Sequence, residues 1–116
     1  MISDIKDNME KNKYTAVIFG GTVEGRLLTE RFAGREINIY ISVATEYGAS
    51  LIPNADNIHI YCGRLDGKGI EELLNSLIKQ CGDGGIICID ATHPYAVEAT
   101  RNIMAACRET RVEYMR

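Results

Sequence analysis

Two short polar segments, far apart in the sequence, carry residue types that can hold a phosphorylated ligand and transfer a proton. Their sequences are GGTVEGR at residues 20–26 and DATHPYA at residues 90–96. Each segment follows a run of apolar residues, at 16–19 and at 86–89, and each precedes a stretch with helical spacing. Such strand-to-helix turns lie at the carboxyl edge of a parallel sheet, where open α/β sheets bind their ligands.

The first segment has the composition of a turn that binds a diphosphate. Gly20 and Gly21 allow backbone N–H groups to approach the ligand closely, and the N-terminus of the helix after them favours an anion. Thr22 can cap this helix or donate its hydroxyl to a phosphate, whereas Gly25 permits close packing on the strand. Arg26 can reach a phosphate as well. The usual G-x-G-x-x-G pattern lacks its middle glycine here, so a tight turn without a ligand remains an alternative.

The ends of two further strands bear on how a dinucleotide would bind. Ser42 stands where an acidic residue usually contacts the adenosine ribose, and Thr45 follows it closely. Small hydroxyls accommodate a 2′-phosphate better than a carboxylate does, which favours NADP, although Glu46 lies only a few residues later. Gly63 and Arg64 follow the next strand, and Arg64 is a candidate for contact with an anion.

The second segment concentrates groups that can act in acid–base chemistry. Thr92, His93 and Tyr95 supply a hydroxyl, an imidazole and a phenol directly after Asp90. A histidine with a carboxylate nearby can transfer a proton near neutral pH. Asp90, His93 and Tyr95 are therefore the candidate catalytic residues, and Thr92 is a candidate ligand contact. Alternatively, Asp90 or Thr92 caps the following helix and His93 only braces the loop.

Alternating strands and helices are predicted to position these turns. Apolar and β-branched runs predict strands at 14–19, 37–43, 58–62, 86–89 and 112–115, and helical spacing predicts helices at 23–32, 45–51, 67–80 and 96–110. This alternation predicts an α/β fold, with a doubly wound, Rossmann-like parallel sheet of five strands and helices on both faces. We expect the first and fourth strands to be neighbours, which brings the two polar segments together.

Bulk composition excludes several classes of protein. The chain has 116 residues and a formal net charge of −3 at pH 7. Without a basic stripe, a nucleic-acid partner is not expected, and no apolar run approaches the roughly 20 residues that cross a membrane. Residues 1–13 mix charges and lack the apolar centre of a signal peptide, so we expect a poorly ordered or weakly helical leader before one domain at 14–116.

The cysteines indicate a reducing compartment. Cys62, Cys81, Cys88 and Cys107 form no C-x-x-C pair and match no spacing of zinc ligands, so no metal site is predicted. Cys88 and Cys107 lie inside apolar segments. This favours small buried side chains in the cytoplasm over a disulfide framework.

The chain resembles the precorrin-6A reductase family of cobalamin (vitamin B12) biosynthesis, including its cobalt-precorrin-6A branch. The resemblance rests on the two polar segments together with SVATEYG at 42–48 and GRLD at 63–66. It implies a reductase that transfers a hydride from NADPH or NADH to a double bond of a ring-contracted tetrapyrrole. Family members have two Rossmann-like halves, so residues 14–116 would form the N-terminal half and the C-terminal half would be a missing partner.

The resemblance also implies roles for individual residues. It gives Gly20, Gly21, Thr22 and Arg26 to the dinucleotide, the 42–45 and 63–66 turns to the cofactor or the cleft rim, and 90–95 to the meeting point of nicotinamide and macrocycle. Because the substrate carries many carboxylates, Arg26, Arg64 and Arg101 are candidate anchors. A non-catalytic, flavodoxin-like nucleotide-binding or regulatory module is the alternative, and activity of this half alone stays open.

Overall fold

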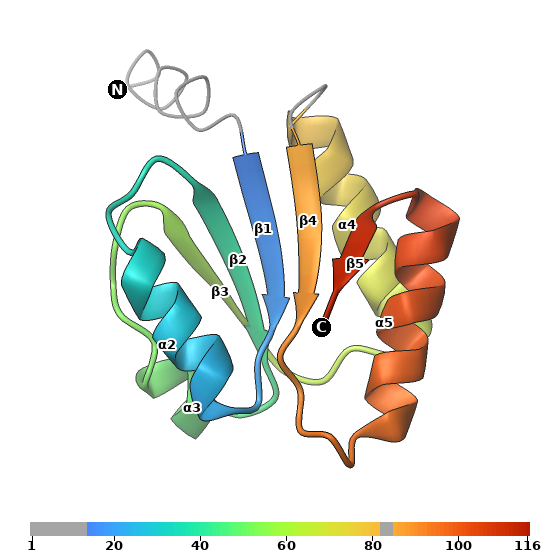
Figure 1. Ribbon diagram of the computed structural model, residues 1–116, viewed down its shortest axis with the longest axis horizontal. Coiled ribbons are helices and arrows are strands. Elements are labelled where there is room, and N and C mark those ends of the chain that lie inside the picture. Colours follow the sequence, from blue (N-terminus) through green and yellow to red (C-terminus); the bar gives the residue numbers. More distant parts are fainter. Residues whose placement is uncertain (1–13, 82–84) are drawn as a thin grey trace.

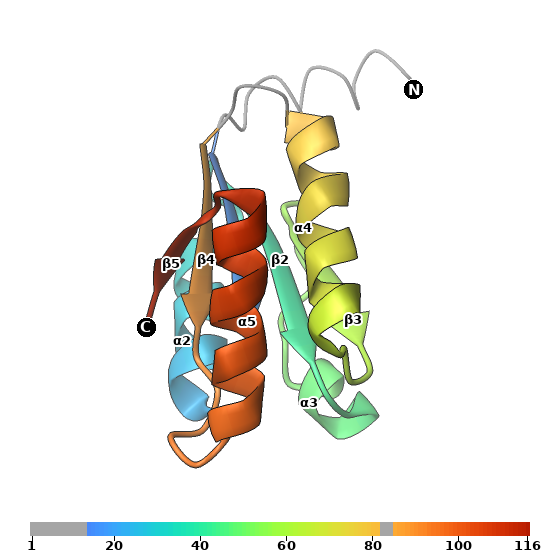
Figure 2. The ribbon, with the colours of Figure 1, turned by 90° about the vertical axis from the view of Figure 1, so that its right-hand side faces the viewer.

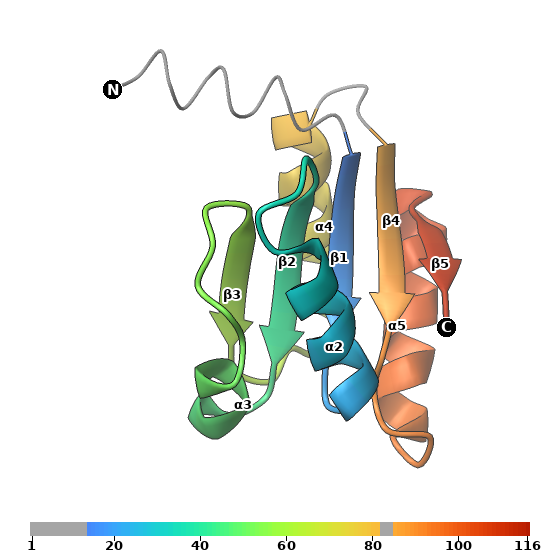
Figure 3. The same cartoon turned by 60° about the vertical axis from the view of Figure 1, so that its left-hand side comes forward.

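Five parallel strands form one sheet in the computed structural model, which describes residues 14–81 and 85–116. The strands are β1 (Tyr14–Phe19), β2 (Asn38–Val43), β3 (Ile58–Cys62), β4 (Gly85–Asp90) and β5 (Glu113–Met115). They lie in the order β3-β2-β1-β4-β5 (Figure 3). The predicted neighbourhood of the first and fourth strands is confirmed, because β1 and β4 pair in parallel over their whole length.

Helices cover both faces of the sheet, as predicted. One face carries α2 (Val23–Phe32) and the short α3 (Glu46–Ser50), and the other carries α4 (Gly67–Cys81) and α5 (Val97–Thr110) (Figure 1). Figure 2 shows α4 and α5 side by side on their face. The predicted leader at 1–13 lies outside the described residues, as do residues 82–84.

The alternation of side chains along β1 explains how one strand serves two hydrophobic cores. Val17 and Phe19 pack in the core beneath α4 and α5, whereas Ala16 and Ile18 pack in the core beneath α2 and α3. All four side chains are buried, as expected for a central strand covered on both faces. The continuous apolar sequence of β1 therefore follows from its place in the middle of the sheet.

The four cysteines differ in burial, and Cys81 at the end of α4 is only partly buried. Cys88 on β4 and Cys107 on α5 are buried in the core, which confirms the prediction for these two residues. Cys62 is exposed, so the expectation that all four cysteines are small core residues is wrong for it. Cys62 ends β3, which is an edge strand of the sheet and leaves its end open to solvent. No helix in the described part of the chain combines the length and apolarity needed to span a membrane.

A buried asparagine holds the connection between α2 and β2. The side-chain nitrogen of Asn57 lies 2.8 Å from the carbonyl oxygens of Phe32 and Ile37 and 3.1 Å from that of Arg35. Its side-chain oxygen accepts a 2.8 Å hydrogen bond from the backbone N–H of Gly34. Asn57 is only 5% exposed, so it satisfies backbone groups that water does not reach.

Candidate functional site

The two polar turns begin at neighbouring strand ends. Phe19 and Asp90, the last residues of β1 and β4, are partners in the ladder. Just beyond them, the N–H of Ala91 donates a 2.9 Å hydrogen bond to the carbonyl oxygen of Phe19, and the N–H of Gly20 donates to the carbonyl oxygen of Ser42 at 2.9 Å. The ends of β1, β2 and β4 are thus tied together at the carboxyl edge of the sheet, as the sequence predicts.

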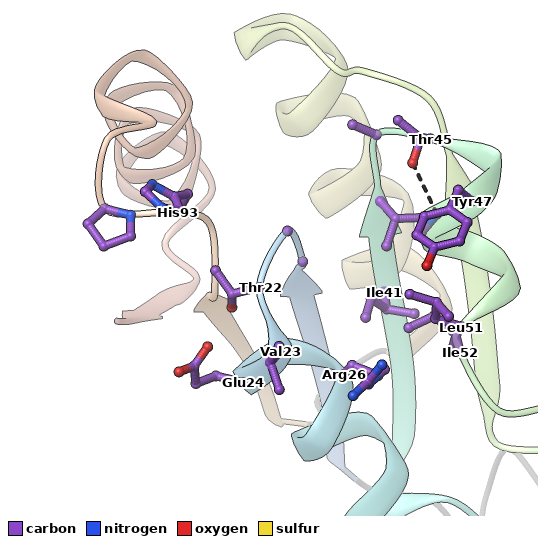
Figure 4. A pocket seen from close by; sticks show the side chains of 16 residues that line it. Thr22, Val23, Glu24, Arg26, Ile41, Thr45, Tyr47, Leu51, Ile52 and His93 are labelled. Atoms are coloured by element: carbon purple, nitrogen blue, oxygen red, sulfur yellow. Dashed lines mark hydrogen bonds between the residues drawn. The ribbon is translucent and has the colours of Figure 1, made fainter.

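A cleft of about 750 Å³ opens on one side of the Gly20–Gly21 turn, between α2 and α3; we call it the α3 cleft. Of the residues predicted to bind a cofactor, Thr22, Arg26 and Thr45 line this cleft, and His93 lies at one end of it (Figure 4). Its remaining wall is mostly apolar and includes Ile41, Val43, Tyr47, Leu51 and Ile52, and Glu24 is an acidic residue in the lining.

A second cleft of about 630 Å³ lies on the other side of the same turn and runs toward the N-terminus of α5; we call it the α5 cleft. Its lining includes the predicted residues Ser42, Gly63, Arg64, Thr92 and Tyr95. Gly20, Gly21, Ala44 and His93 line both clefts. The two clefts therefore meet at the glycine turn.

Three of the sequence candidates lie elsewhere. Gly25 and Asp90 line neither of the two clefts, and Arg101 lies with Met104 and Arg108 along a shallower groove on α5. A Cβ atom added to Gly25 would lie 3.1 Å from the Cβ of Ala91, so the predicted close packing of α2 at this glycine is confirmed.

Gly63 shows why the turn after β3 needs a glycine. Its φ angle is +126°, a conformation that residues with a side chain rarely adopt. Its N–H donates a 2.8 Å hydrogen bond to the carbonyl oxygen of Val43, which fixes the turn to the end of β2. This turn places Arg64 at the α5 cleft.

Thr22 does not cap α2 with its side chain, so that predicted alternative is wrong. It occupies the N-cap position in an extended conformation, but its hydroxyl donates a 2.8 Å hydrogen bond to the carbonyl oxygen of Ala91. The hydroxyl is directed toward the carbonyl on the neighbouring turn and accepts no hydrogen bond from the N–H groups of α2. The N-terminal N–H groups of α2 are therefore not capped by this residue and remain available to an anion.

Asp90 joins the turn after β4 to α5 and β5 instead of facing a cleft. Its Oδ1 accepts hydrogen bonds from the N–H of Thr92 at 3.0 Å and from the Thr92 hydroxyl at 2.6 Å. Its Oδ2 accepts from the hydroxyls of Thr100 and Tyr114, both at 2.8 Å, and from Arg116 at 3.0 Å. The alternative in which Asp90 or Thr92 caps α5 is wrong, because the N-cap of this helix is Ala96.

These hydrogen bonds determine the charge of Asp90. Burial by itself raises the pKa of the Asp90 carboxyl, but the hydrogen bonds from Thr92, Thr100 and Tyr114 outweigh burial and hold the pKa below its ordinary value. Asp90 is therefore an ionised acceptor at neutral pH. For the same reason, burial and the bond to the Asp90 carboxylate raise the pKa of the Tyr114 phenol.

The exposed loop after Asp90 carries the candidate proton-transfer groups. The Nδ1 atom of His93 accepts a 3.2 Å hydrogen bond from the N–H of Tyr95, and the centroids of the two rings lie 4.9 Å apart. In a neutral imidazole that accepts at Nδ1, the hydrogen is on Nε2. Tyr95 is 87% exposed, so its phenol is free to meet a ligand or another protein surface.

Arg26 is a cation at the wall of the α3 cleft with little competition for its charge. Its Nε atom lies 3.7 Å from a carboxylate oxygen of Glu30, one helical turn away. The Nε atom of Arg26 is buried and has no hydrogen-bond partner within the described residues. The Arg26 side chain is 36% exposed. Because an exposed i,i+4 pair at this distance is weak, Arg26 can turn its charge toward an anion in the cleft.

The structure adds residues that sequence analysis missed. Tyr47, Leu51 and Ile52 form the apolar wall of the α3 cleft, and the i,i+4 spacing of Tyr47 and Leu51 could have indicated a shared face. Thr100 and Arg116 complete the surroundings of Asp90, and no local pattern marks them. Within 14–81 and 85–116, no group of three or more His, Cys, Asp or Glu residues is placed to hold a metal ion.

Curated relatives match most of this chain. It is 32% identical over 108 residues to the cobalt-precorrin-6A reductase of Methanothermobacter thermautotrophicus, which covers 92% of this chain and 34% of the relative. It is 26% identical over 102 residues to the enzyme of the same name from Synechocystis sp., covering 88% of this chain and 37% of that protein. The chain thus spans about a third of the length of these relatives.

Two further comparisons complete this picture. No solved structure gives a significant match. The family model described as "Precorrin-6x reductase CbiJ/CobK" matches residues 15–116, which include the strands and helices that form both clefts. The resemblance inferred from the four motifs is thereby confirmed, and the chain belongs to the precorrin-6x reductase CbiJ/CobK family.

Proposed function

We propose that this chain is the nucleotide-binding N-terminal half of a reductase of cobalamin biosynthesis. The reductase would transfer a hydride from NADPH or NADH to a double bond of precorrin-6A or cobalt-precorrin-6A. The observation that carries this proposal is the meeting of two clefts at the Gly20–Gly21 turn, with His93 lining both. Membership of the family and the names of the curated relatives support the reaction class.

The residues at the sheet edge fit a dinucleotide. A diphosphate at Gly20–Gly21 would meet the N-terminus of α2, whose first N–H groups have no partner within the helix. One nucleotide half would then enter each cleft, and both clefts have volumes typical of ligand sites. Arg26 and Thr45 would hold the part in the α3 cleft, while Ser42, Gly63 and Arg64 would hold the part in the α5 cleft. Thr22 and Thr92 would line the clefts, because their hydroxyls already donate to Ala91 and Asp90. Gly25 would contribute through packing of α2.

The end of β2 bears on the choice between the two dinucleotides. Ser42, Ala44 and Thr45 line the clefts there, and Glu46 is not among the lining residues of either. Since no carboxylate from this strand end lines the clefts, a 2′-phosphate would meet no repulsion from it. This arrangement favours NADPH.

The nicotinamide supplies the hydride when the cofactor is bound, and the chain orients the reactants. On the exposed loop, His93 lines both clefts and Tyr95 lines the α5 cleft, so they would shape the site and face the macrocycle. Asp90 is ionised and has no free oxygen, so it would act through the loop and not as a proton donor. Arg64 at the α5 cleft, with Arg26 and Arg101, would anchor carboxylates of the substrate.

Calorimetric titration of the chain with NADPH and with NADH tests the proposal. We expect binding of at least one of them, with affinity about 10- to 150-fold weaker after Arg26→Ala, because a charge-assisted hydrogen bond of about 1.5–3 kcal/mol is lost. Arg31→Ala is the matched control, since Arg31 lies in the last turn of the same helix outside both clefts. Binding of neither dinucleotide would contradict the proposal.

Turnover separates the reductase from the alternative, a non-catalytic nucleotide-binding module. The full-length protein, given the dinucleotide that binds, should oxidise it only when precorrin-6A or cobalt-precorrin-6A is added. Dinucleotide binding without oxidation under either substrate would favour the regulatory module.

A further inference from the structure

The buried carboxylate of Asp90, at the end of β4, lines neither of the two clefts. Asp90 accepts five hydrogen bonds from residues of its own chain, and its side chain is fully buried. We propose that Asp90 is a positioning residue, which clamps the loop that carries His93 and Tyr95 onto α5 and β5. This inference rests on the proposed function only for the identity of the ligand that the loop meets.

The two carboxylate oxygens have separate tasks. Oδ1 takes both hydrogen bonds from Thr92, the first polar residue of the loop. Oδ2 takes the hydroxyls of Thr100 and Tyr114 and the guanidinium of Arg116. One small ionised group therefore bridges the loop on one side to a helix and a strand on the other. The number of donors, the charge of the carboxylate and the charge of Arg116 together make such a bridge strong.

The rest of the loop depends on this bridge. Beyond Thr92, the recorded bonds of the loop are internal: the N–H of Tyr95 donates to His93 Nδ1 at 3.2 Å, and the N–H of Ala96 donates to the His93 carbonyl oxygen at 2.8 Å. His93, Pro94 and Tyr95 are exposed, so burial contributes little to holding the loop. The position of the His93 ring at both clefts thus depends on the anchor at Thr92, together with the bonds of Ala91 to Phe19 and Thr22.

Thr100 is the member of the network that can be changed with the least disturbance. Its hydroxyl donates to Asp90 Oδ2 at 2.8 Å and lies 3.3 Å from the Thr92 hydroxyl. Thr100 therefore contacts both the carboxylate and the loop residue that the carboxylate holds. Thr100 lines neither the α3 cleft nor the α5 cleft. Its hydroxyl also accepts a hydrogen bond from Arg116, so any effect of Thr100 on the loop passes through its partners Asp90, Thr92 and Arg116.

The experiment compares Thr100→Val, which keeps the shape and removes the hydroxyl, with Thr100→Ser, which keeps the hydroxyl. Thr110→Val is the matched control on the same helix, because the Thr110 hydroxyl bonds only to carbonyl oxygens of α5. The readouts on the full chain are amide hydrogen exchange at residues 92–96, the ¹⁵N shifts of the His93 imidazole, and affinity for NADPH and NADH.

We expect Thr100→Val to raise hydrogen exchange in the loop about tenfold and to shift the His93 signals, with Thr100→Ser and Thr110→Val close to the unmodified protein. Unchanged exchange and unchanged His93 signals in Thr100→Val would overturn the inference. If Thr100→Val does not fold, Tyr114→Phe removes a different donor to the same oxygen and is judged by the same readouts.

The proposed function and the positioning role can fail separately. Exchange and His93 signals are measured without a dinucleotide, so they report on the clamp alone. If the unmodified chain binds neither dinucleotide and the Val and Ser variants still differ in the loop, the proposed function fails and the clamp is supported.

Discussion

The hydroxyl of Thr22 donates a 2.8 Å hydrogen bond to the carbonyl oxygen of Ala91, a residue 69 positions later in the chain. This bond links the turn after β1 to the turn after β4. The N–H of Ala91 donates in the opposite direction, to the carbonyl oxygen of Phe19 at 2.9 Å. The glycine turn and the loop that carries His93 are therefore held as one unit, although each is an exposed connection at the edge of the sheet.

We predict that Thr22→Val destabilises the fold by about 0.5–1.5 kcal/mol, the usual net value of one such hydrogen bond. Valine keeps the shape of threonine, so the loss reports on the bond to Ala91. Dinucleotide affinity should fall as well, since the two turns would no longer be held together. Urea unfolding and calorimetry measure the two effects. Thr22→Ser retains the donor and is the control; equal losses in both variants would contradict the role of the bond.

Gly25, in the first turn of α2, makes a second contact with the turn after β4. A Cβ atom at this position would lie 3.1 Å from the Cβ of Ala91 and 3.4 Å from the Cα of Gly20. We predict that Gly25→Ala pushes α2 away from the sheet, with a loss of about 1–3 kcal/mol in the free energy of unfolding. Thermal or urea unfolding measures this loss.

A double-mutant cycle gives the Gly25 prediction its control. Ala91→Gly removes the methyl group that the new side chain meets, so it should restore part of the stability of Gly25→Ala. Gly67→Ala is the matched single change, because a Cβ there meets Asn102 only at ordinary contact distance. If Gly25→Ala is no more harmful than Gly67→Ala, the close packing of α2 does not limit stability.

Regular apolar spacing made much of the fold predictable. The stripe that includes Ile70, Leu74 and Leu77 predicted a helix at 67–80, and α4 ends one residue later, at Cys81. The predicted strand at 86–89 extends by one residue at each end, to Gly85 and Asp90. These two residues lack the apolar signal of a strand and join β4 because β1 offers them backbone partners.

The surroundings of Asp90 could not be predicted in the same way. Tyr114 and Arg116 lie 24 and 26 positions after Asp90 and reach it only because β5 pairs with β4. The cap that was one alternative for Thr22 does not form for a related reason, since the acceptor of its hydroxyl lies on a turn that is remote in sequence. Placement at the sheet edge follows from topology, whereas the partners of single polar groups depend on tertiary packing.

We predict that Asn57→Ala lowers the free energy of unfolding by more than about 3 kcal/mol. The change leaves the carbonyl oxygens of Phe32 and Ile37 and the N–H of Gly34 without their buried partner. Urea unfolding measures the loss. The control is Asn54→Ala, because Asn54 is exposed and lies, like Asn57, between α3 and β3. This control should change the free energy of unfolding by no more than about 0.5 kcal/mol. Similar losses for the two variants would contradict the role of Asn57 as the buried hydrogen-bond partner of the α2–β2 connection.

Acidification should weaken the fold through Asp90. The pKa of this carboxyl is lowered in the folded state, relative to an unfolded value of about 3.9, so the unfolded chain binds a proton first. The stabilisation is fully present above about pH 4 and is lost as the pH falls through the folded-state pKa. Asp90→Asn removes this titration. The difference in unfolding free energy between Asp90→Asn and the unmodified chain should therefore shrink below about pH 4; a difference that stays constant with pH would contradict the prediction.

His93 offers a test of whether the loop shapes the site or supplies a proton. Its Nδ1 is occupied by the N–H of Tyr95, two residues on, and its ring lines both clefts. We predict that His93→Ala weakens dinucleotide binding in the full-length protein more than it slows turnover at saturating cofactor. Calorimetry measures the first quantity, and oxidation of the dinucleotide with added substrate measures the second.

His93→Asn sharpens the comparison, because an asparagine side-chain oxygen readily accepts from the backbone N–H two residues on. It can therefore replace the bond to the N–H of Tyr95 while removing the imidazole. If His93 shapes the loop, the asparagine variant should recover most of the affinity that His93→Ala loses, and it should retain turnover. If both variants bind the dinucleotide normally and both lose kcat, the imidazole itself takes part in proton transfer and the shaping role is wrong.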